Sequence, residues 1–562
     1  MKKHVFFLMA VALIITTVAI NSCKKEKEIT LVSITVTTQP AKKTYIIGET
    51  FDPSGMEVTA TYSDNTTQPV TPTKLKYDFT TAGTDKTVTI TFTENDKTVK
   101  TTVSGITVKE NDPWKPTSGN VGPRPNTADD PADGIYVSPD GNDATATGSI
   151  DKPYKSINSA LAKAKSGATI ILRGGTYKEG QNVRVNLSNI TIKSRKDEWA
   201  IIDLTTYNPG NQEHSGVYFR PDASGGKLQS VEVIGGYYAV CMETTWDWGP
   251  SYPTRYGASN IIIEDCKLHD SRNDVVKVKP NCKNITIRYN EIYNSGREHV
   301  AHTDFDTGQR NAEGIDNVNG DGMHVHNNYI HDICSNAIYA KGGATGALIE
   351  NNLIKHAYGA GILLGFDTSP EYFSTAVNPK YYENIQGIAR NNLIINVGWE
   401  GIGLYASKDA QVYNNTIVNA VGYGRGLFHS PIYFGVATQD WENPTGCPPN
   451  INPKIHHNIV SQPSTYNNRM IDIRYATGVY SFGLSALDGK PAMNNNCYFV
   501  AGKNATFTDN RPDKKIDKAG LAAWQTHIGG DSGSLEVDPA LNADYMPANA
   551  QCAEMGIQIP LK

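Results

Sequence analysis

The chain has 562 residues, and its 52 lysines and arginines against 57 aspartates and glutamates give a formal net charge of −5. This nearly neutral balance argues against a general electrostatic attraction to nucleic acid. Charged residues make up only 19% and hydrophobic residues 39%, while glycine (50) and tyrosine (29) are abundant. The composition is typical of a β-rich exported protein rather than a helical enzyme or a disordered chain.

The N-terminus predicts the compartment. A basic start is followed by an apolar run over residues 5–20, which is short for a membrane span and indicates a signal peptide over residues 1–22. Cys23 follows at once and resembles the lipidated cysteine of bacterial lipoproteins. The resemblance implies a mature chain that begins at Cys23, is anchored in the bacterial cell envelope by its lipid, and continues as a tether over residues 23–30. A plain secretory signal is the alternative.

The remaining cysteines are widely spaced and contain no Cys-x-x-Cys pair, which argues against a disulfide framework and a structural zinc site. Most are expected to be small buried residues. Cys266 and Cys282 could pair if they lie on adjacent turns of a repeat.

Residues 31–109 alternate between apolar and polar positions in short runs separated by turn signals, which predicts an antiparallel β-sandwich. Residues 45–64 resemble the bacterial immunoglobulin-like domains that precede catalytic modules on surface proteins. Such a domain acts as a spacer or binds carbohydrate. Residues 110–133 are rich in proline and glycine and are expected to form a linker.

A repeat dominates the rest of the chain. An asparagine followed by apolar residues recurs every 23 or 24 residues, or every 38 to 40 where an insertion intervenes, at Asn290, Asn328, Asn352, Asn392 and Asn415. This periodicity predicts a solenoid whose stacked asparagines form a hydrogen-bonded ladder.

The ends of the repeat have their own signals. Residues 152–177 resemble the cap and first coil of secreted right-handed parallel β-helices. The predicted fold class is therefore all-β, with an N-terminal immunoglobulin-like sandwich, a right-handed parallel β-helix over residues 134–503 and a C-terminal capping segment over residues 504–562.

The register of the repeat predicts one outward-facing strip. Ten residues after each repeat start lies an apolar position expected to face inward, and in the second coil this is Val300. The flanking positions then face outward, and insertions on both sides would wall them into a groove. The outward strip carries Lys277, Lys279, Tyr339, Lys341 and Tyr405.

The repeat also begins at Cys266, one coil before Asn290, with cysteine in place of asparagine. In four coils an acidic or amide residue lies eight positions after the repeat start, at Asp274, Glu298, Asn336 and Glu400. Stacked carboxylates repel one another, so a bound cation would stabilise them. The insertion that follows the second coil carries a further acidic group, which is interpreted as a solvated loop rather than a metal site. This group consists of Asp304, Asp306, Glu313, Asp316 and Asp321.

Residues 134–562 resemble the parallel β-helix polysaccharide lyases, particularly the sixth family (chondroitinase B and alginate lyases) and the ninth family (pectate lyases). Asp274 and Lys279 match the sixth-family spacing between an acidic residue and the catalytic lysine, and Asn336 and Lys341 match it with an amide. Residues 335–341 also resemble the segment that carries the ninth-family base. Two features depart from these patterns: the sixth-family arginine one coil later is missing, and the ninth-family aspartate cluster is thin.

The resemblance implies β-elimination on a uronate-containing polysaccharide, with a lysine base and calcium. The base is Lys279 or Lys341. Lys277 would bind a substrate carboxylate, and Lys277 and Lys279 would lower each other's pKa. The expected calcium ligands are Asp274, Glu298 and Asn336, and the expected substrate-binding residues are Tyr339, Tyr405, Arg272 and His302. The expected partner is an acidic polysaccharide, and the chain is expected to be a monomer.

Two other functions stay open. A β-helix glycoside hydrolase would need two placed carboxylates, which Glu298 and Glu400, or Asp304 and Asp306, could supply. A non-catalytic glycan-binding or adhesive surface protein would use the same groove only to retain its polymer.

Overall fold

A computed structural model describes residues 28–46, 49–81, 83–109, 118–205, 215–245, 255–296, 311–422, 429–438, 447–477 and 483–562. The chain forms two compact units, Met1–Lys115 and Pro116–Lys562. Cys23, Glu298, His302, Asp304 and Asp306 lie outside the described residues. Within the described residues, no helix is both long and apolar enough to cross a membrane.

The first unit is a sandwich of two sheets, as the alternating sequence predicts. Its core contains Tyr45, Phe51 and Phe79, whose rings lie 4.7–6.0 Å apart. One sheet contains β1 (Leu31–Thr38), β3 (Glu57–Tyr62) and β4 (Thr67–Val70), and the other contains β2 (Thr44–Ile46), β7 (Lys97–Lys109), β6 (Gly83–Glu94) and β5 (Lys74–Lys76).

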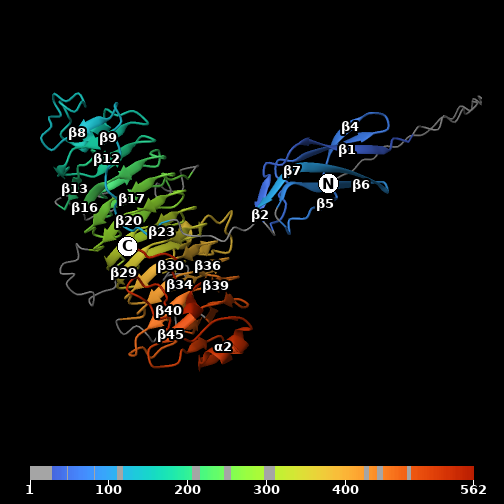
Figure 1. Cartoon of the computed structure of the whole chain (residues 1–562). Coiled ribbons are helices and arrows are strands. Elements are labelled where there is room, and N and C mark those ends of the chain that lie inside the picture. The colour runs from blue at the N-terminus through green and yellow to red at the C-terminus, as the bar shows by residue number, and fades with distance from the viewer. Residues whose placement is uncertain are drawn as a thin grey trace, which may run out of the picture. The chain divides into compact units, whose positions relative to one another are not determined.

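The second unit is a parallel β-helix in which successive strands of each coil enter three long sheets in turn (Figure 1). Sheet 1 contains β8 (Ile135–Val137), β9 (Thr169–Leu172), β12 (Thr191–Ser194), β15 (Lys227–Gln229), β18 (Ile262–Glu264), β21 (Thr286–Arg288), β24 (His324–His326), β28 (Leu348–Glu350), β32 (Ile388–Arg390), β36 (Gln411–Tyr413), β39 (Lys454–His456) and β44 (Ala492–Asn494). Sheet 2 contains β10 (Gly175–Tyr177), β13 (Ala200–Leu204), β16 (Val231–Gly235), β19 (Lys267–His269), β22 (Glu291–Tyr293), β25 (Tyr329–Ile333), β29 (Leu353–Ala357), β33 (Leu393–Ile395), β37 (Thr416–Val418), β40 (Ile459–Gln462) and β45 (Cys497–Val500).

Sheet 3 carries the candidate site. It contains β11 (Val183–Val185), β14 (Val217–Phe219), β17 (Val240–Met242), β20 (Val276–Val278), β23 (Ile315–Val318), β26 (Ile338–Lys341), β30 (Ile362–Leu364), β34 (Ile402–Tyr405), β38 (Ile432–Gly435), β41 (Ile471–Ile473), β46 (Phe507–Asp509) and the antiparallel β47 (Ile516–Ala519). Short strands β27 (Ala344–Thr345), β31 (Asn384–Ile385) and β35 (Ser407–Lys408) pair beside it, and β42 (Tyr475–Ala476) pairs with β43 (Leu484–Ser485). The helices are α1 (Ile157–Leu161) and α2 (Leu521–Ile528), with 3-10 turns at Pro370–Tyr372, Pro512–Lys514 and Ala550–Cys552.

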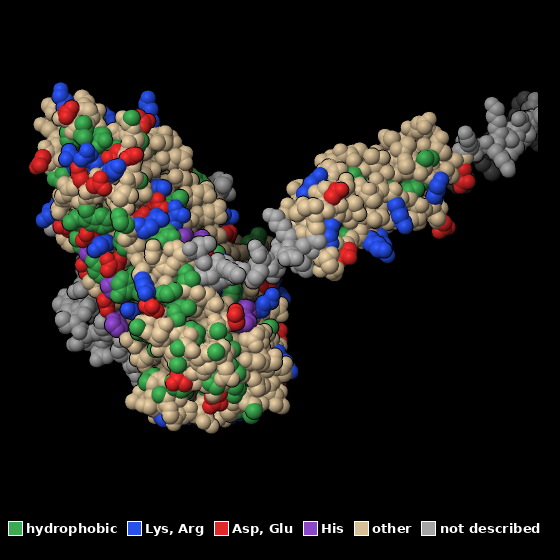
Figure 2. Space-filling model, in the orientation of Figure 1, with side chains coloured by type: hydrophobic (Ala, Val, Ile, Leu, Met, Phe, Trp, Pro, Cys, Tyr) green, Lys and Arg blue, Asp and Glu red, His purple; other side chains and the backbone are tan. Residues whose placement is uncertain are grey.

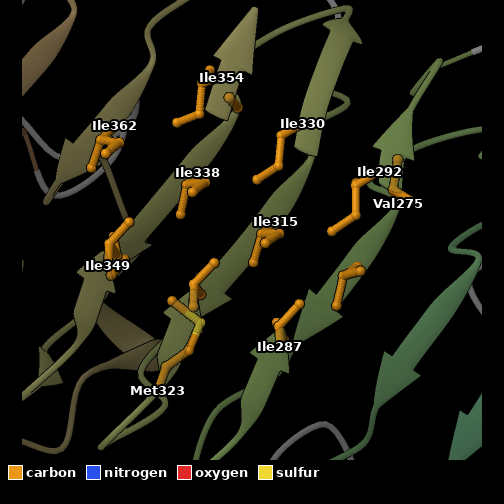
Figure 3. Close-up of a cluster of buried hydrophobic side chains, with 14 of the residues drawn as sticks. Val275, Ile287, Ile292, Ile315, Met323, Ile330, Ile338, Ile349, Ile354 and Ile362 are labelled. Carbon is orange, nitrogen blue, oxygen red and sulfur yellow. The ribbon is translucent and has the colours of Figure 1, made fainter. Parts of the chain in front are cut away.

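Aliphatic side chains from all three sheets meet in one core (Figure 3). Ile287 and Ile349 come from sheet 1, Ile330 from sheet 2, and Ile315 and Ile338 from sheet 3, and all five are fully buried. Each coil therefore covers the apolar surface of its neighbour, as a solenoid requires. Truncation of one such isoleucine to alanine costs about 2–5 kcal/mol.

The predicted asparagine ladder is confirmed. Asn290, Asn328, Asn352, Asn392 and Asn415 are fully buried, and each donates its Nδ2 to Oδ1 of the asparagine in the next coil at 3.0 Å. The ladder continues through Asn458 to Asn496. These asparagines are structural, because every one has its amide committed to the turn.

The segment before the β-helix is only partly a linker. In residues 118–133, Arg124 pairs with Asp265 at 2.7 Å, and the amide of Asn327 donates to the carbonyl of Asn120. The C-terminal segment runs back along the same side, where Lys562 exchanges two backbone hydrogen bonds with residues 119 and 121. Figure 1 accordingly shows the C-terminus beside β29 rather than at the last coil. Residues 118–133 and the C-terminal segment therefore pack along one side of the β-helix.

The surface of the β-helix mixes both signs of charge. Figure 2 shows Lys, Arg, Asp and Glu side chains next to one another on the coils around β8–β17. Many of them are paired, for example Arg173 with Glu198 at 2.9 Å and Arg195 with Glu198 at 2.6 Å.

Cys266 and Cys282, proposed as a pair from the sequence, are both free thiols buried in the core. The other described cysteines are likewise buried, as expected for small apolar residues.

Candidate active site on the outer face of sheet 3

The register of sheet 3 differs from the sequence prediction at one coil. Val276 on β20 pairs with Ile315 on β23, and Ile315 pairs with Ile338 on β26. The sequence prediction placed Val300, rather than Ile315, between Val276 and Ile338, which put the insertion after the strand. In the structure the insertion precedes the strand. Glu313, two residues before Ile315, therefore takes the position that was assigned to Glu298.

This register brings three carboxylates together. Asp274, Glu313 and Asp316 are buried, and one carboxylate oxygen from each lies within 4.8 Å of the others. Asp274 Oδ1 accepts the backbone N–H of Glu313 at 3.0 Å, and Glu313 Oε1 accepts the hydroxyl of Ser335 at 3.0 Å. The interpretation of Glu313 and Asp316 as parts of a solvated loop is therefore wrong, because Asp316 is on a strand of the sheet.

Lys277 is the counter-ion of this acidic cluster. Its Nζ lies 3.2 Å from Asp274 Oδ2 and donates a hydrogen bond to Asp316 Oδ2. Burial lowers the pKa of Lys277, but Asp316 and Asp274 outweigh this effect and raise the pKa well above its usual value. Lys277 therefore stays charged. The expectation that its pKa is lowered is therefore wrong, and the binding of a substrate carboxylate by Lys277 stays a prediction.

The cluster retains more negative charge than one lysine neutralises. Burial, and then the neighbouring Asp274, raise the pKa of Glu313 well above its usual value. Burial also raises the pKa of Asp316 to about 6, although Lys277 opposes the shift. Glu313 Oε2 and Asp316 Oδ1 are buried without a hydrogen-bond partner among the described residues. Oxygen atoms left without donors in this way are the ligands that calcium takes, so the residues fit a divalent cation.

Asn336 has a different role from the one expected. Its Nδ2 lies 3.4 Å from Glu313 Oε1, and its Oδ1 accepts the backbone N–H of Ala360 at 2.9 Å. The amide thus supports the acidic cluster from the next coil, with its oxygen turned to the backbone.

Lys341 lies on the neighbouring coil in a different environment. Its Nζ donates to the backbone carbonyl of Asp367 at 3.0 Å and lies 4.5 Å from the ring centroid of Tyr339. No carboxylate of the described residues forms an ion pair with Lys341, in contrast to Lys277 and Lys279. Lys279 is nearly buried, and its Nζ lies 3.8 Å from Glu243 Oε1, which belongs to the preceding coil.

A cavity of about 250 Å³ opens between these groups. It is bordered by the side chains of all three lysines and Asp316, and by one wall of the insertion that follows β30. The residues that line it and matter most here are Lys277, Lys279, Lys341, Asp316, Tyr237 and Tyr238. The three lysines predicted from the sequence therefore share one cavity.

The aromatic residues of the strip do not form an open stacking surface. Tyr339 is 1% exposed and Tyr405 is 6% exposed. Both belong to a second hydrophobic cluster, outside the main core, where insertion residues such as Phe366 cover them. Tyr405 donates its hydroxyl to Glu400 at 2.6 Å. Of the expected substrate-binding residues in the described part, Arg272 has its guanidinium 5.9 Å from the ring of Tyr237, which lines the cavity.

Sequence reasoning missed Glu313 and Asp316 as ligands and Tyr237 and Tyr238 as cavity residues. No sequence signal identified the first two, because the predicted register put the polar His302 on the inward face and the true inward residue is polar as well. In the structure the equivalent inward residue is Asn317, whose amide is satisfied by Gly320 at 2.9 and 3.0 Å.

Comparisons with known proteins agree with this architecture. Residues 135–337 match the family described as Pel9A-like, right handed beta helix region. Residues 313–511 match the right handed beta helix region family, and residues 38–103 match the bacterial Ig-like domain (group 3). The second unit is thus a right-handed parallel β-helix, and the first is a bacterial immunoglobulin-like domain.

One similar protein is a pectate lyase PEL9 of Emericella nidulans, 35% identical over 119 residues, which are 19% of this chain and 29% of the relative. The match thus spans less than a third of that protein. Among solved structures, pectate lyase Pel9A is 16% identical with a TM-score of 0.39, covering 60% of this chain and 78% of that one. A rhamnogalacturonan lyase is 14% identical with a TM-score of 0.39, covering 60% and 84%.

Proposed function

We propose that the chain is a polysaccharide lyase that cleaves a uronate-containing glycan by β-elimination in the cavity around Lys341. The observation that carries the proposal is the pairing of two unlike groups on adjacent coils. Asp274, Glu313 and Asp316 form a buried cluster with unsatisfied oxygens, and of these Asp316 borders the cavity. Lys341 borders the same cavity as Asp316, without an ion-paired carboxylate among the described residues. The similarity of residues 135–337 to the Pel9A-like family supports the same reaction.

Asp274, Glu313 and Asp316 would hold the metal ion, with calcium as the ion that suits an all-oxygen ligand set. A bound calcium would attract the uronate carboxylate and stabilise the negative charge that develops on it. Lys277 neutralises part of the cluster, so the site holds its shape before the ion binds.

Lys341 is the proposed base. Its Nζ donates one hydrogen bond to the carbonyl of Asp367, and both residues border the cavity. The amine takes the proton from C5 of the uronate. The electron pair of that C–H bond forms the C4=C5 double bond, the C4–O4 bond breaks, and O4 leaves and takes a proton from water.

Lys279 serves the substrate rather than the proton transfer. It borders the cavity, and Glu243 keeps its side chain in place at 3.8 Å. A lysine in this position on the cavity suits a carboxylate on a neighbouring sugar.

Anchoring belongs to the same proposal. A lipid on Cys23 would hold the enzyme in the bacterial cell envelope, with the immunoglobulin-like domain as a spacer between the membrane and the β-helix. The supporting features are the signal-like run over residues 5–20 and the position of Cys23 directly after it.

The test is the ultraviolet absorbance of the unsaturated product. The protein from residue 24 onward is incubated with polygalacturonate, alginate, dermatan-type and other uronate polymers, with calcium or with a chelator. Absorbance that the chelator removes is expected for the wild type. Lys341→Ala is expected to lose it, whereas Lys355→Ala, a lysine on sheet 2, keeps it. New reducing ends without absorbance would indicate a hydrolase, and polymer binding without any cleavage would indicate an adhesive protein.

A further inference from the structure

A second cavity, of about 370 Å³, lies at the first coil of the β-helix. It is bordered by the end of α1 and by residues on both sides of β11, the first strand of sheet 3. The residues that matter for its chemistry are Gln181, Asn182, Arg184, Asn186 and Leu187.

The two cavities occupy equivalent places on the same sheet. Arg184 pairs with Tyr218, Tyr218 with Cys241, and Cys241 with Lys277, so Arg184 and Lys277 occupy the same outward column three strands apart. Asn186 lies two residues after Arg184, and Lys279 lies two residues after Lys277. The first-coil cavity thus repeats the geometry of the candidate active site.

The chemistry of the two cavities differs in an informative way. Gln181 takes the position of Asp274 relative to its strand, and Asn186 takes that of Lys279, so the first-coil cavity has no acidic cluster and no candidate base. It has one cation, Arg184, whose exposed guanidinium forms no ion pair with any described residue. Such a cavity can bind an anion and cannot perform the elimination.

Arg184 and its neighbours suit an acidic sugar. A guanidinium binds a carboxylate through two parallel hydrogen bonds. The side-chain amides of Gln181 and Asn186 offer donors and acceptors to hydroxyl groups. Leu187, 37% exposed, gives an apolar contact for the C–H face of a sugar ring.

We propose that the first-coil cavity binds a uronate residue of the same polymer chain whose scissile bond lies at Lys341. This inference rests on the proposed function. Five strand spacings of about 4.8 Å lie between β11, which carries Arg184, and β26, which carries Lys341, so the two residues are about 24 Å apart along the sheet. One sugar cannot bridge that distance, so only a longer oligosaccharide occupies both cavities, and the enzyme prefers long chains.

The test uses the full chain with Lys341→Ala, which prevents turnover, and size-graded fragments of polygalacturonate. Calorimetric titration is expected to show tighter binding of long fragments than of a disaccharide. Adding Arg184→Ala is expected to weaken the binding of long fragments by about tenfold to a hundredfold, with no change for the disaccharide. Arg184→Lys is expected to restore part of the loss.

Lys163→Ala is the matched control, because this exposed lysine follows α1 outside the cavity. Its substitution should leave the difference in affinity between long fragments and the disaccharide unchanged. All variants should keep the wild-type melting temperature. If the protein with Arg184→Ala still binds long fragments more tightly than the disaccharide by the same factor, this inference alone is wrong. If no fragment binds either protein, both this inference and the proposed action on polygalacturonate are wrong.

Discussion

Glu383 accepts the backbone N–H of Gly342, the residue after Lys341, at 2.7 Å. The same Oε2 atom accepts the hydroxyl of Thr368 at 2.7 Å. Thr368 follows Asp367, whose carbonyl receives Lys341 Nζ. One fully buried carboxyl group therefore connects both attachments of Lys341, its own strand and the insertion that orients its amine. Glu383 is a positioning residue for the proposed base.

The protonation of Glu383 makes this arrangement dependent on pH. Burial raises its pKa to about 8, well above the value of an unfolded chain. Its contribution to stability is therefore fully present below about pH 4 and is lost as pH rises to about 8. Relative to Glu383→Gln, the wild type should lose up to about 4 kcal/mol of unfolding free energy across that interval. Melting curves of both proteins from pH 5 to pH 8.5 check this, and parallel curves would contradict it.

The acidic cluster predicts a metal-dependent stability. In a chelator, Glu313→Gln should raise the melting temperature, because burial and the neighbouring Asp274 disfavour the ionised form of the Glu313 carboxyl. In calcium the order should reverse, because the variant lacks a ligand, whereas a site saturated a hundredfold adds about 2.7 kcal/mol to the wild type. Thermal unfolding with chelator and with calcium measures the difference in melting temperature between the variant and the wild type under both conditions.

The control for that experiment is Glu371→Gln, an exposed acid on the 3-10 turn Pro370–Tyr372. It should respond to calcium as the wild type does. Equal stabilisation of wild type and Glu313→Gln by calcium would show that the cluster is not the binding site.

The sequence predicts the fold well because each coil repeats the same physical requirement. The spacing of Asn352 and Asn392 shows which residues stack, and apolar residues such as Ile338 and Ile362 show which side is inward. The candidate site was less predictable where an insertion interrupts the repeat. A gap of 38 residues fits an insertion before or after the strand, and only the packing of Ile315 against Ile338 distinguishes the two. Burial of Tyr405 depends on the insertions that cover it, which no local pattern specifies.

The three lysines of the cavity should differ in their kinetic behaviour. Lys341→Ala should lower kcat by about 10²–10⁴-fold with little effect on KM, because it removes the proton acceptor. Lys279→Ala should chiefly raise KM for the polymer, because it removes a cation beside the substrate. Steady-state rates on the polymer identified by the absorbance test measure both effects. A Lys341→Ala protein with wild-type kcat would exclude Lys341 as the base.

Lys277→Ala should act through stability instead. Removal of the partner of a buried charge costs about 3–5 kcal/mol, so the variant should unfold earlier in a chelator. Calcium should recover much of this loss, since the ion supplies positive charge to Asp274 and Asp316. A loss that calcium leaves unchanged would indicate that Lys277 and the ion do not share the cluster.

Substitution of one buried asparagine of the ladder should lower the free energy of unfolding more than substitution of an exposed turn asparagine. Asn352→Ala removes the acceptor of Asn328 and the donor to Asn392, and leaves the carbonyl of Val325 without its partner. Each buried polar group left unsatisfied costs about 1–3 kcal/mol, so the variant should lose about 3 kcal/mol or more. Asn419→Ala is the control, because its amide donates to Asn396 at an exposed turn and should cost less than about 1 kcal/mol. Hydrogen exchange of β28 and β29, read together with urea unfolding, should show faster exchange only in Asn352→Ala. Equal losses in both variants would mean that the buried position of the ladder adds nothing beyond an ordinary turn.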